Sequence, residues 1–320
     1  MTITRRCCAL ALVAATLGCI GVAHAQDYPT RFIRVVVGPG PDIVARLFGA
    51  KITDTLGQQV VVEPRPGAGG TIAAQTVASA APDGYNLLLA SASYTINTAM
   101  AQSPFDLGRD FAPIGLVATV PFVLVIHPSL AAKDLAGLIA LAKANPGKLN
   151  YASSGIGTPP HLAGELFKSM AGVDIVHVPF REANAALNAV VSGSVQMMFS
   201  IASTAGSQMN GGTVRGIGVT TLAPSPLVPG LPALAQSGLP GFTVIGWNGF
   251  VAPKGTPATV VGKLNAALQR GLDDPELRQR LAASGYEPAE RNSPDDFAAF
   301  IASDTAKWVA LVEKTNIKGQ

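Results

Sequence analysis

The sequence predicts an α/β protein of two lobes, each a mainly parallel sheet flanked by helices, with a ligand cleft between the lobes. Three observations predict this fold class. Short apolar runs rich in β-branched residues alternate with longer segments of helical period. This alternation starts at Ile33–Val37 and starts again at Phe122–Ile126. Gly- and Ser-rich segments follow several of the expected strands, which is where open α/β sheets bind ligands.

The first set of elements has the order β-α-β-α-β. Its expected strands are Ile33–Val37, Val60–Glu63 and Asn86–Leu89. The first helix is expected to begin after a capping Asp42 and to end at Gly57. The second follows the Gly-rich turn at residues 66–70 and runs to Ala81. This order predicts a parallel sheet that is covered by helices on both faces.

The second set has the same alternation and is followed by a return of the chain. The expected strands are Phe122–Ile126, Leu149–Ala152, Ile175–Val178, Val195–Phe199, Arg215–Val219 and Trp247–Val251. The expected helices are Leu135–Ala144, Thr158–Met170, Ala183–Val191, Pro257–Leu272, Pro275–Ser284 and Pro294–Thr315. The last two begin with Pro after a capping residue, which is a strong start signal. With crossings near residues 127 and 248, lobe 1 comprises 26–127 and 248–320, and lobe 2 comprises 128–247.

The first 25 residues have the pattern of a secretory signal peptide. Arg5 and Arg6 precede an apolar run too short to span a membrane, and Ala23-His24-Ala25 forms a cleavage site before Gln26. A lipoprotein site at Cys19 is the weaker alternative. Cleavage after Ala25 places the mature protein in the periplasm. All three cysteines lie in this segment, so the mature chain has no disulfide, thiolate nucleophile or cysteine metal site.

Composition and motifs exclude several classes of function. The chain has 23 Lys and Arg against 20 Asp and Glu, so it has no basic field for nucleic acid. No metal-binding pattern, nucleophile elbow or phosphate-binding P-loop is present, and no cofactor is expected. The histidines of the mature chain, His127, His161 and His177, are interpreted as structural. Trp247 fits a core position and a ligand wall equally well.

Three polar segments after expected strands are the candidate ligand site. The candidate residues are Gly40, Asp42, Ser91, Ser93, Ser153, Ser154, Gly155, Gly157 and Thr158. The segment 153–158 precedes a helix, and its amides and hydroxyls suit an anion at the positive end of the helix dipole. Pro159 and Pro160 remove two helix donors, so the loop amides have to supply the contacts. The alternative for Thr158 is a plain helix cap.

Several longer motifs resemble one known family. They include Pro64–Gly70, Ala81–Tyr85, Pro146–Tyr151, Ser153–Thr158 with His161-Leu162 and Glu165-Leu166-Phe167, and His177–Phe180. With these motifs the chain resembles the Bug family, the TctC-like extracytoplasmic solute-binding proteins of tripartite tricarboxylate transporters. The resemblance implies a type II periplasmic-binding-protein fold that closes on a small carboxylate. It also implies a monomer without enzyme activity that delivers its ligand to the membrane components of the transporter.

Two departures from the family pattern bear on the ligand. The loop 38–42, Gly-Pro-Gly-Pro-Asp, is shorter than the family's loop, which affects affinity or ligand size. Ser200 stands where the family often has Asp, so it favours a plain carboxylate over an amino acid and joins the candidate site. Two other functions stay open. One is a homologue that senses a ligand and signals to a partner without transport, and the other is a secreted hydrolase or isomerase, for which no nucleophile–base pair is evident.

Overall fold

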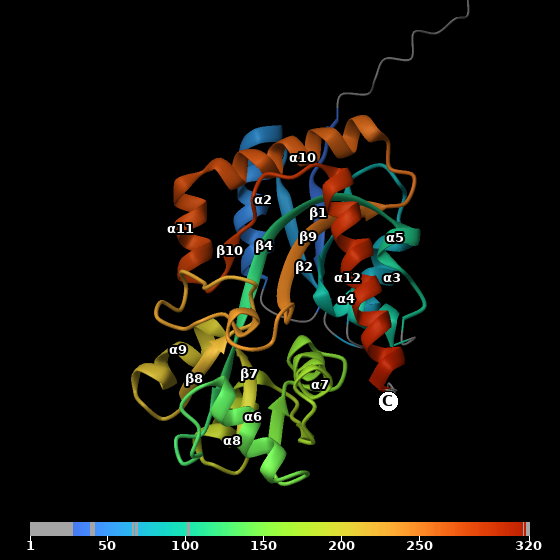
Figure 1. Cartoon of the computed structure of the whole chain (residues 1–320). Helices are drawn as coiled ribbons and strands as arrows, with labels where there is room; N and C mark the ends of the chain where they lie inside the picture. Colours follow the sequence, from blue (N-terminus) through green and yellow to red (C-terminus); the bar gives the residue numbers. More distant parts are fainter. Residues whose placement is uncertain are drawn as a thin grey trace, which may run out of the picture.

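The computed structural model describes residues 28–38, 42–65, 67, 70–100, 103–315 and 317. The predicted signal segment and Gly40 lie outside the described residues. Two groups of strands and helices are joined by the long strand β4 (Phe111–Ile126), which passes from the upper group to the lower group in Figure 1. The fold is therefore the predicted α/β architecture, and the division into lobes at residues 127 and 248 stays a prediction.

The first group is a sheet with the order β2-β1-β3-β9-β4, to which β10 adds on β4. Its strands are β1 (Ile33–Val37), β2 (Val60–Pro64), β3 (Asn86–Ser91), β9 (Ile245–Pro253) and β10 (Glu287–Pro288), with the first part of β4. β1 is parallel to both β2 and β3, as the β-α-β-α-β order predicts. The returning strand β9 is antiparallel to β3 and β4.

The second group forms on the other end of β4. Residues 122–126 pair antiparallel with β7 (Met197–Ile201), and residues 123–126 also pair with β8 (Arg215–Val219). β5 (Asn150–Ser153) lies between β7 and β6 (Val176–Pro179) and is parallel to both. Each group therefore has a parallel three-stranded part with antiparallel strands added beside it.

Helices cover both groups. Those of the first group are α2 (Ile43–Leu56), α3 (Thr71–Ala78), α4 (Ala92–Ala99), α5 (Leu107–Asp110), α10 (Ala258–Asp273), α11 (Pro275–Ala283) and α12 (Pro294–Thr315). Those of the second are α6 (Leu135–Ala144), α7 (Pro159–Ala171), α8 (Ala183–Val191) and α9 (Ala202–Asn210), with a short 3₁₀ turn at Leu234–Gln236. Within the described residues, no helix has both the length and the apolar character needed to span a membrane.

Alternating strand residues build the cores on opposite faces of each sheet, because successive side chains of a strand point to opposite sides. In β1, Val35 and Val37 pack with α2 and α10, whereas Val36 packs with α3 and α12. In β4, Leu124 packs with α6 and α7, whereas Val125 packs with α8 and α9. The strands are therefore buried on both faces, which explains their continuous apolar character in the sequence.

β4 is longer than the sequence predicts. Only Phe122–Ile126 was expected as a strand, but pairing extends back to Phe111. The earlier part contains Pro113, Gly115 and Pro121, which interrupt any strand signal. The register shifts at 113/115 and at 116/118 absorb these residues, as bulges do. Tertiary pairing with β9 therefore overrides a weak local preference.

Helix starts show where local chemistry agrees with the sequence and where it does not. Asp274 accepts hydrogen bonds from the amides of Glu276 and Leu277, as a capping residue does. Ser293 is likewise a cap for α12, since its hydroxyl oxygen accepts from the amide of Asp296. Asp42, by contrast, makes no cap hydrogen bond and instead forms an ion pair with Arg46 at 2.6 Å. Helices α4 and α9 were not predicted, because they are short and uncharged.

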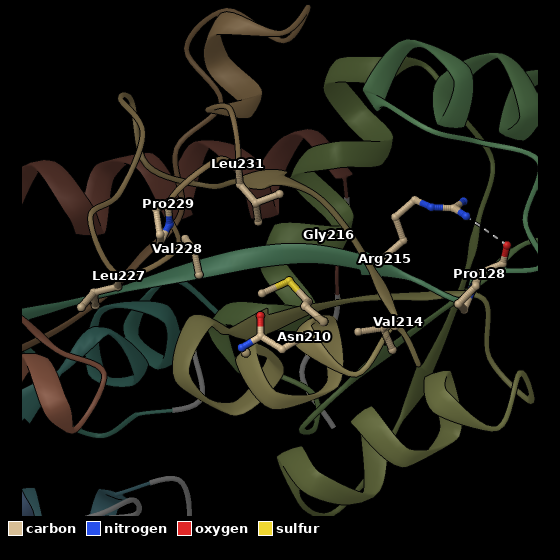
Figure 2. Close-up of a pocket in the computed structure, with 12 residues that line it drawn as sticks. Pro128, Asn210, Val214, Arg215, Gly216, Leu227, Val228, Pro229 and Leu231 are labelled. Atoms are coloured by element: carbon tan, nitrogen blue, oxygen red, sulfur yellow. Dashed lines mark hydrogen bonds between the residues drawn. The ribbon is translucent and has the colours of Figure 1, made fainter.

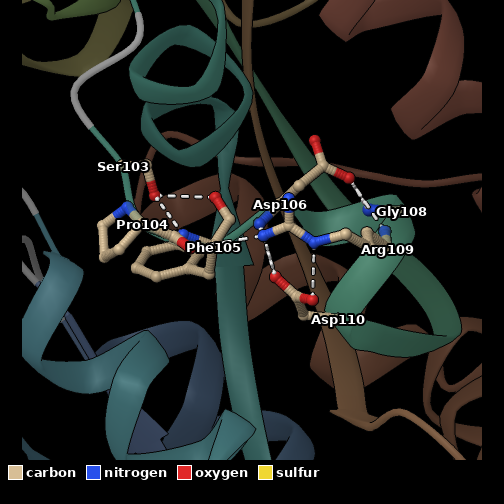
Figure 3. A network of polar contacts seen from close by, with 7 residues as sticks. All are labelled: Ser103, Pro104, Phe105, Asp106, Gly108, Arg109 and Asp110. Atoms are coloured by element: carbon tan, nitrogen blue, oxygen red, sulfur yellow. Dashed lines mark hydrogen bonds and ion pairs between the residues drawn. The ribbon is translucent and has the colours of Figure 1, made fainter.

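A compact polar turn fixes the start of β4 (Figure 3). The Asp106 carboxylate accepts from the amides of Gly108 and Arg109 at 2.9 and 2.8 Å. In return, the Asp110 carboxylate accepts from the Asp106 amide at 2.9 Å. The Arg109 guanidinium donates to Asp110, and this hydrogen bond lowers the pKa of that carboxyl. The reciprocal caps fix the start of the single turn of α5, from which the chain enters β4.

Candidate functional site

A cavity of about 550 Å³ lies where elements of the two groups meet. Four helices begin at its wall, as the lining residues show: Ser91, Ala92 and Ser93 for α4, Pro159 and Pro160 for α7, Glu182 and Ala183 for α8, and Ile201 for α9. A helix N-terminus carries a partial positive charge and unpaired amide donors. Four such ends around one cavity create a site for an anion.

On the side of the first group, the donors are short polar side chains. Ser91 precedes α4 without making a side-chain cap, and its backbone pairs with Asn248 of β9. Ser91, Ser93 and Asn248 all line the cavity. Within the described part of the chain, their side chains have no hydrogen-bond partner, so two hydroxyls and one amide are available to a ligand.

On the side of the second group, every second backbone amide of the loop 153–158 is left free at the cavity by the residues that the structure describes. Gly155 donates its N–H to the Ser153 hydroxyl oxygen at 3.1 Å, and Gly157 donates its N–H to Nδ1 of His161 at 3.2 Å. Positive φ angles of 127° and 75° at these glycines allow the turns. Among the described residues, nothing pairs with the N–H groups of Ser154, Ile156 and Thr158. These three residues line the cavity.

Thr158 does not use its hydroxyl as a helix cap. Its Oγ1 donates to the carbonyl of Gly155 at 2.6 Å and so closes the loop on itself. The amides of Gly155 and Gly157, which the sequence offered as ligand contacts, are engaged inside the loop. The sequence therefore located the loop, and the structure assigns the available donors to its even-numbered positions.

The charged side chains at the cavity are Arg181 and Glu182, both exposed. They lie in the short connection between β6 and α8. Neither side chain has an ion-pair or hydrogen-bond partner within the described residues. Arg181 supplies a full positive charge beside the four helix ends, so it adds to the attraction of an anion. Glu182 opposes that attraction and restricts where on this wall a carboxylate can lie.

The structure brings together six of the ten residues predicted for the site. Those that line the cavity are Ser91, Ser93, Ser154, Gly157, Thr158 and Ser200. Ser153 and Gly155 lie behind the lining and shape the loop. Asp42 is not among the lining residues and is occupied by Arg46, whereas Gly40 lies outside the described residues. Ser200 is only 2% exposed, and its hydroxyl donates weakly to the next carbonyl at 3.4 Å.

Sequence reasoning missed several lining residues, namely Asn97, Arg181, Glu182 and Tyr286. The signal for Arg181 was present, because it stands shortly after a strand, at the sheet edge where ligands bind. Tyr286 gave no such signal. It follows α11, far along the chain, and only the tertiary fold brings it to the cavity.

A buried stack of three rings supports the loop from behind. His177 lies between Tyr151 and His161, at ring distances of 4.8 and 4.2 Å. The Ser153 hydroxyl and Nε2 of His177 are hydrogen-bonded at 2.7 Å. Burial lowers the pKa of His161, and burial together with the neighbouring His161 lowers the pKa of His177 to about 4. Both rings are therefore neutral at pH 7.

Trp247 belongs to the core and to the cavity wall. It is 1% exposed, and its indole N–H donates to the Asp304 carboxylate at 3.0 Å. The Thr95 hydroxyl donates to the same carboxylate at 2.7 Å, and Lys307 forms an ion pair with it at 2.8 Å. This buried network joins α4, β9 and α12, and so fixes the wall that carries Ser91 and Ser93.

A second hollow of about 580 Å³ lies between β8, the end of α9 and the segment 227–231 (Figure 2). Its Arg215 donates to the carbonyls of Pro128, Leu130 and Ala132, so this cation already has acceptors. The C-terminal end of α9, with Met209 and Asn210, faces this hollow, and a helix C-terminus repels anions. The first cavity is therefore the one suited to a carboxylate.

Comparison with known proteins agrees with this geometry. The model of the TctC family, described as the tripartite tricarboxylate transporter family receptor, matches residues 44–317. The chain belongs to this family. The resemblance to the Bug proteins is confirmed as well, because this TctC-family chain is 32% identical to protein BugT of Bordetella pertussis, over 99% of each chain.

Solved structures of TctC-like proteins share the fold. R. palustris Rpa4515 with adipate aligns with a TM-score of 0.79 at 30% identity, over 91% of this chain and 99% of that one. MatC from Rhodopseudomonas palustris with bound malate aligns with a TM-score of 0.75 at 34% identity, over 89% and 100%. The periplasmic-binding-protein fold predicted for this TctC-family chain is therefore confirmed.

Proposed function

We propose that the protein captures a small organic carboxylate in the cavity between its two groups of strands and delivers it to the membrane components of a tripartite tricarboxylate transporter. The observation that carries the proposal is the convergence of four helix N-termini and Arg181 on one cavity. A carboxylate suits this cavity, because amide donors and helix dipoles stabilise a negative charge even where no cation contacts it directly.

The donors on the two walls suit a ligand that contacts both. Ser91, Ser93 and Asn248 come from the first group, and the amides of Ser154, Ile156 and Thr158 come from the second. A ligand held by both walls stabilises the arrangement in which they face each other. The adipate and malate bound to the related proteins support a carboxylate, without fixing which one this chain takes.

The cellular setting follows from the family and from the N-terminal sequence. Residues 1–25 have the signal-peptide pattern, and BugD, a solved structure 33% identical to this chain, is described as a periplasmic binding protein. These observations support a protein that works in the periplasm. We propose that it binds its ligand without turnover, because the Ser–His pair of the loop, Ser153 and His177, is not among the residues that line the cavity.

Calorimetric titration of the mature protein, residues 26–320, tests the ligand. Acetate, malate, adipate and citrate serve as probes, each beside its uncharged amide. We expect at least one carboxylate to bind reversibly and none of the amides to bind. Ser154→Ala removes an unpaired hydroxyl at the cavity and is expected to raise Kd by about 3–10-fold. Ser79→Ala, at an exposed serine outside the cavity, is the matched control.

Three results would contradict the proposal. Binding of the amides as tightly as the acids would remove the electrostatic argument. Unchanged affinity in Ser154→Ala would place the ligand elsewhere. Appearance of a product in the titrated samples would make the protein an enzyme.

Uptake of the labelled ligand by cells tests delivery. We expect uptake to fall equally when this protein or the membrane subunits of its transporter are deleted. If deletion of all such transporters does not reproduce the phenotype that follows from loss of this protein, the protein is a sensor, and the delivery proposal is wrong.

A further inference from the structure

We propose that His161 is a positioning residue for the anion-binding loop, which it holds through an unprotonated Nδ1, and that ligand affinity therefore falls on acidification. The inference rests on the proposed function of the loop 153–158. It concerns a residue that the sequence gives only a structural role, and it adds a proton-linked control of binding.

The tautomer of His161 follows from its partner. The N–H of Gly157 lies 3.2 Å from Nδ1, and a backbone N–H can only donate. Nδ1 must therefore present its lone pair, so the proton of the neutral ring is on Nε2. The residue is 5% exposed, so the contact is largely shielded from solvent.

The contact decides which amides of the loop stay free. With the Gly157 N–H held by His161 and the Gly155 N–H held by Ser153, the loop is fixed at alternate residues. The intervening amides, at Ser154, Ile156 and Thr158, are those without partners among the described residues. Loss of the His161 contact would free the Gly157 amide and let this part of the loop rotate. The anion donors would then no longer be held in one orientation.

Protonation of His161 removes the contact directly. A second proton on the ring has to go to Nδ1, which places an N–H against the N–H of Gly157. The loop as observed therefore requires the neutral ring. By linkage, a ligand that needs this loop binds more weakly as the ring takes up its proton.

The surroundings of His161 keep the ring neutral near pH 7. Burial is the largest cause that lowers its pKa; Glu165 works in the opposite direction, and Lys168 adds to the lowering. Glu165 is itself engaged, since it accepts from the Tyr151 hydroxyl at 2.7 Å and from Lys168 at 3.0 Å. The other titratable groups on elements packed against α7 are His177 on β6, Tyr94 on α4, and, on α12, Asp295, Asp296, Asp304, Lys307, Glu313 and Lys314.

His177 is the neighbour that could imitate this effect. It stacks on His161 and touches the loop through Ser153, so its protonation would also disturb the site. Its contact is made by Nε2 to a hydroxyl, which can either donate or accept. A protonated His177 can therefore keep this hydrogen bond, whereas a protonated His161 cannot keep its bond to Gly157.

Two substitutions separate the acceptor from the titrating ring. In His161→Asn, Oδ1 takes the place of Nδ1 and still accepts from Gly157, but the side chain has no ionisable group. In His161→Ala the acceptor is lost. At pH 7.5 we expect Kd to stay within about threefold of wild type for His161→Asn and to rise about tenfold for His161→Ala. Thermal unfolding of both variants shows whether they are folded.

The pH profile of Kd between pH 5.0 and 8.0 is the decisive measurement. The probe is the carboxylate that binds most tightly in the titrations described above, with its own ionisation subtracted. For the wild type, Kd should be constant above pH 7 and rise as pH falls through the lowered pKa of His161, by up to tenfold per pH unit. For His161→Asn it should stay flat. His177→Gln should still lose affinity on acidification, because His161 remains, and His127→Asn, at a histidine whose ring is hydrogen-bonded to Ser129, should keep the wild-type profile.

The possible results decide the matter in different ways. A wild type that binds no carboxylate overturns the proposed function. A wild type that binds, with the same pH profile in His161→Asn, overturns the role of His161 alone. Long-range nitrogen–proton NMR of the free protein gives an independent check, because it reports the tautomer without any ligand. A protonated Nδ1 at pH 7.5 would contradict the inference.

Discussion

Arg181 and the loop amides attract an anion in different ways. The guanidinium is exposed and unpaired within the described residues, so it acts through water, where a charge pair at 4 Å is worth about 1 kcal/mol. The free amides of the loop alternate with those of Gly155 and Gly157, which buried partners hold in place, so the free amides are expected not to reorganise when a ligand binds. We infer that the amides hold the ligand and that Arg181 guides its approach.

Replacement of Arg181 tests this division of roles. Arg181→Gln should raise Kd by about 3–10-fold at low salt, mostly through a slower association rate, and by less in 0.5 M salt. Stopped-flow association kinetics at two salt concentrations measure this. Arg270→Gln removes an exposed positive charge from α10, away from the cavity, and should change neither rate. An effect of Arg181→Gln that is confined to dissociation would show that Arg181 contacts the bound ligand throughout.

At the scale of elements, the approach of α7 to β5 fixes the position of the anion loop. Gly164 lies against the ring of Tyr151, and a Cβ built on this glycine would overlap the ring atoms. The ring cannot move away easily, because it is fully buried and stacked on His177. The absence of one side chain on α7 therefore keeps His161 close enough to reach Gly157.

Gly164→Ala should accordingly lower the free energy of unfolding by about 1–3 kcal/mol, because the core is overpacked. Urea unfolding followed by circular dichroism measures this change. Gly262→Ala on α10 is the matched control, since nothing lies within 4 Å of its built Cβ. That variant should gain about 0.5–1 kcal/mol from helix propensity. Equal effects of the two substitutions would show that the contact with Tyr151 is not tight.

At the scale of the whole molecule, one core cluster crosses from one group of strands to the other. Trp308 and Leu311 of α12 and Ile96 of α4 pack with Leu162 and Phe167 of α7 in the second group. The two groups are therefore joined by apolar packing as well as by β4 and β9. Movement between them is restricted on this side, and opening of the cavity has to come from the opposite side.

Calorimetric unfolding tests whether this shared core cluster couples the two groups. The wild type should unfold in one transition. Trp308→Ala should lose about 3–5 kcal/mol and separate unfolding into two transitions, because it removes a fully buried ring from the shared cluster. Phe300→Ala changes an aromatic residue of the same helix that packs only with the first group, so it should destabilise the protein and leave one transition. A single transition in Trp308→Ala would contradict the role of this cluster in coupling the two groups.

Elements with strong local signals could be predicted from the sequence. Ile33–Val37 matches the observed strand because it is a largely apolar, β-branched run between turns. Pro294–Thr315 matches because Ser293 and Pro294 mark its start. The rule that ligands lie at the ends of strands located Ser154 and Thr158 at the cavity for the same reason.

What the sequence could not predict depends on partners far along the chain. The first half of β4 is a strand only because β9 pairs with it, more than 100 residues later. Tyr286 reaches the cavity through the packing of α11 and β10, which no local pattern shows. Which amides of the loop stay free depends on Nδ1 of His161, which engages the Gly157 amide. Residue spacing alone does not reveal where this side chain points.

The continuity of β4 also sets the order in which the chain can complete its structure as it emerges during synthesis, N-terminus first. Residues 122–126 of β4 pair with β7 and β8, and β5 adds to β7, so this sheet can close before the residues after 219 emerge. The first half of β4 must wait for β9 and β10. Until β9 and β10 are present, this part of β4 is an unpaired strand edge. We expect a chaperone to bind there and misassembly to begin there.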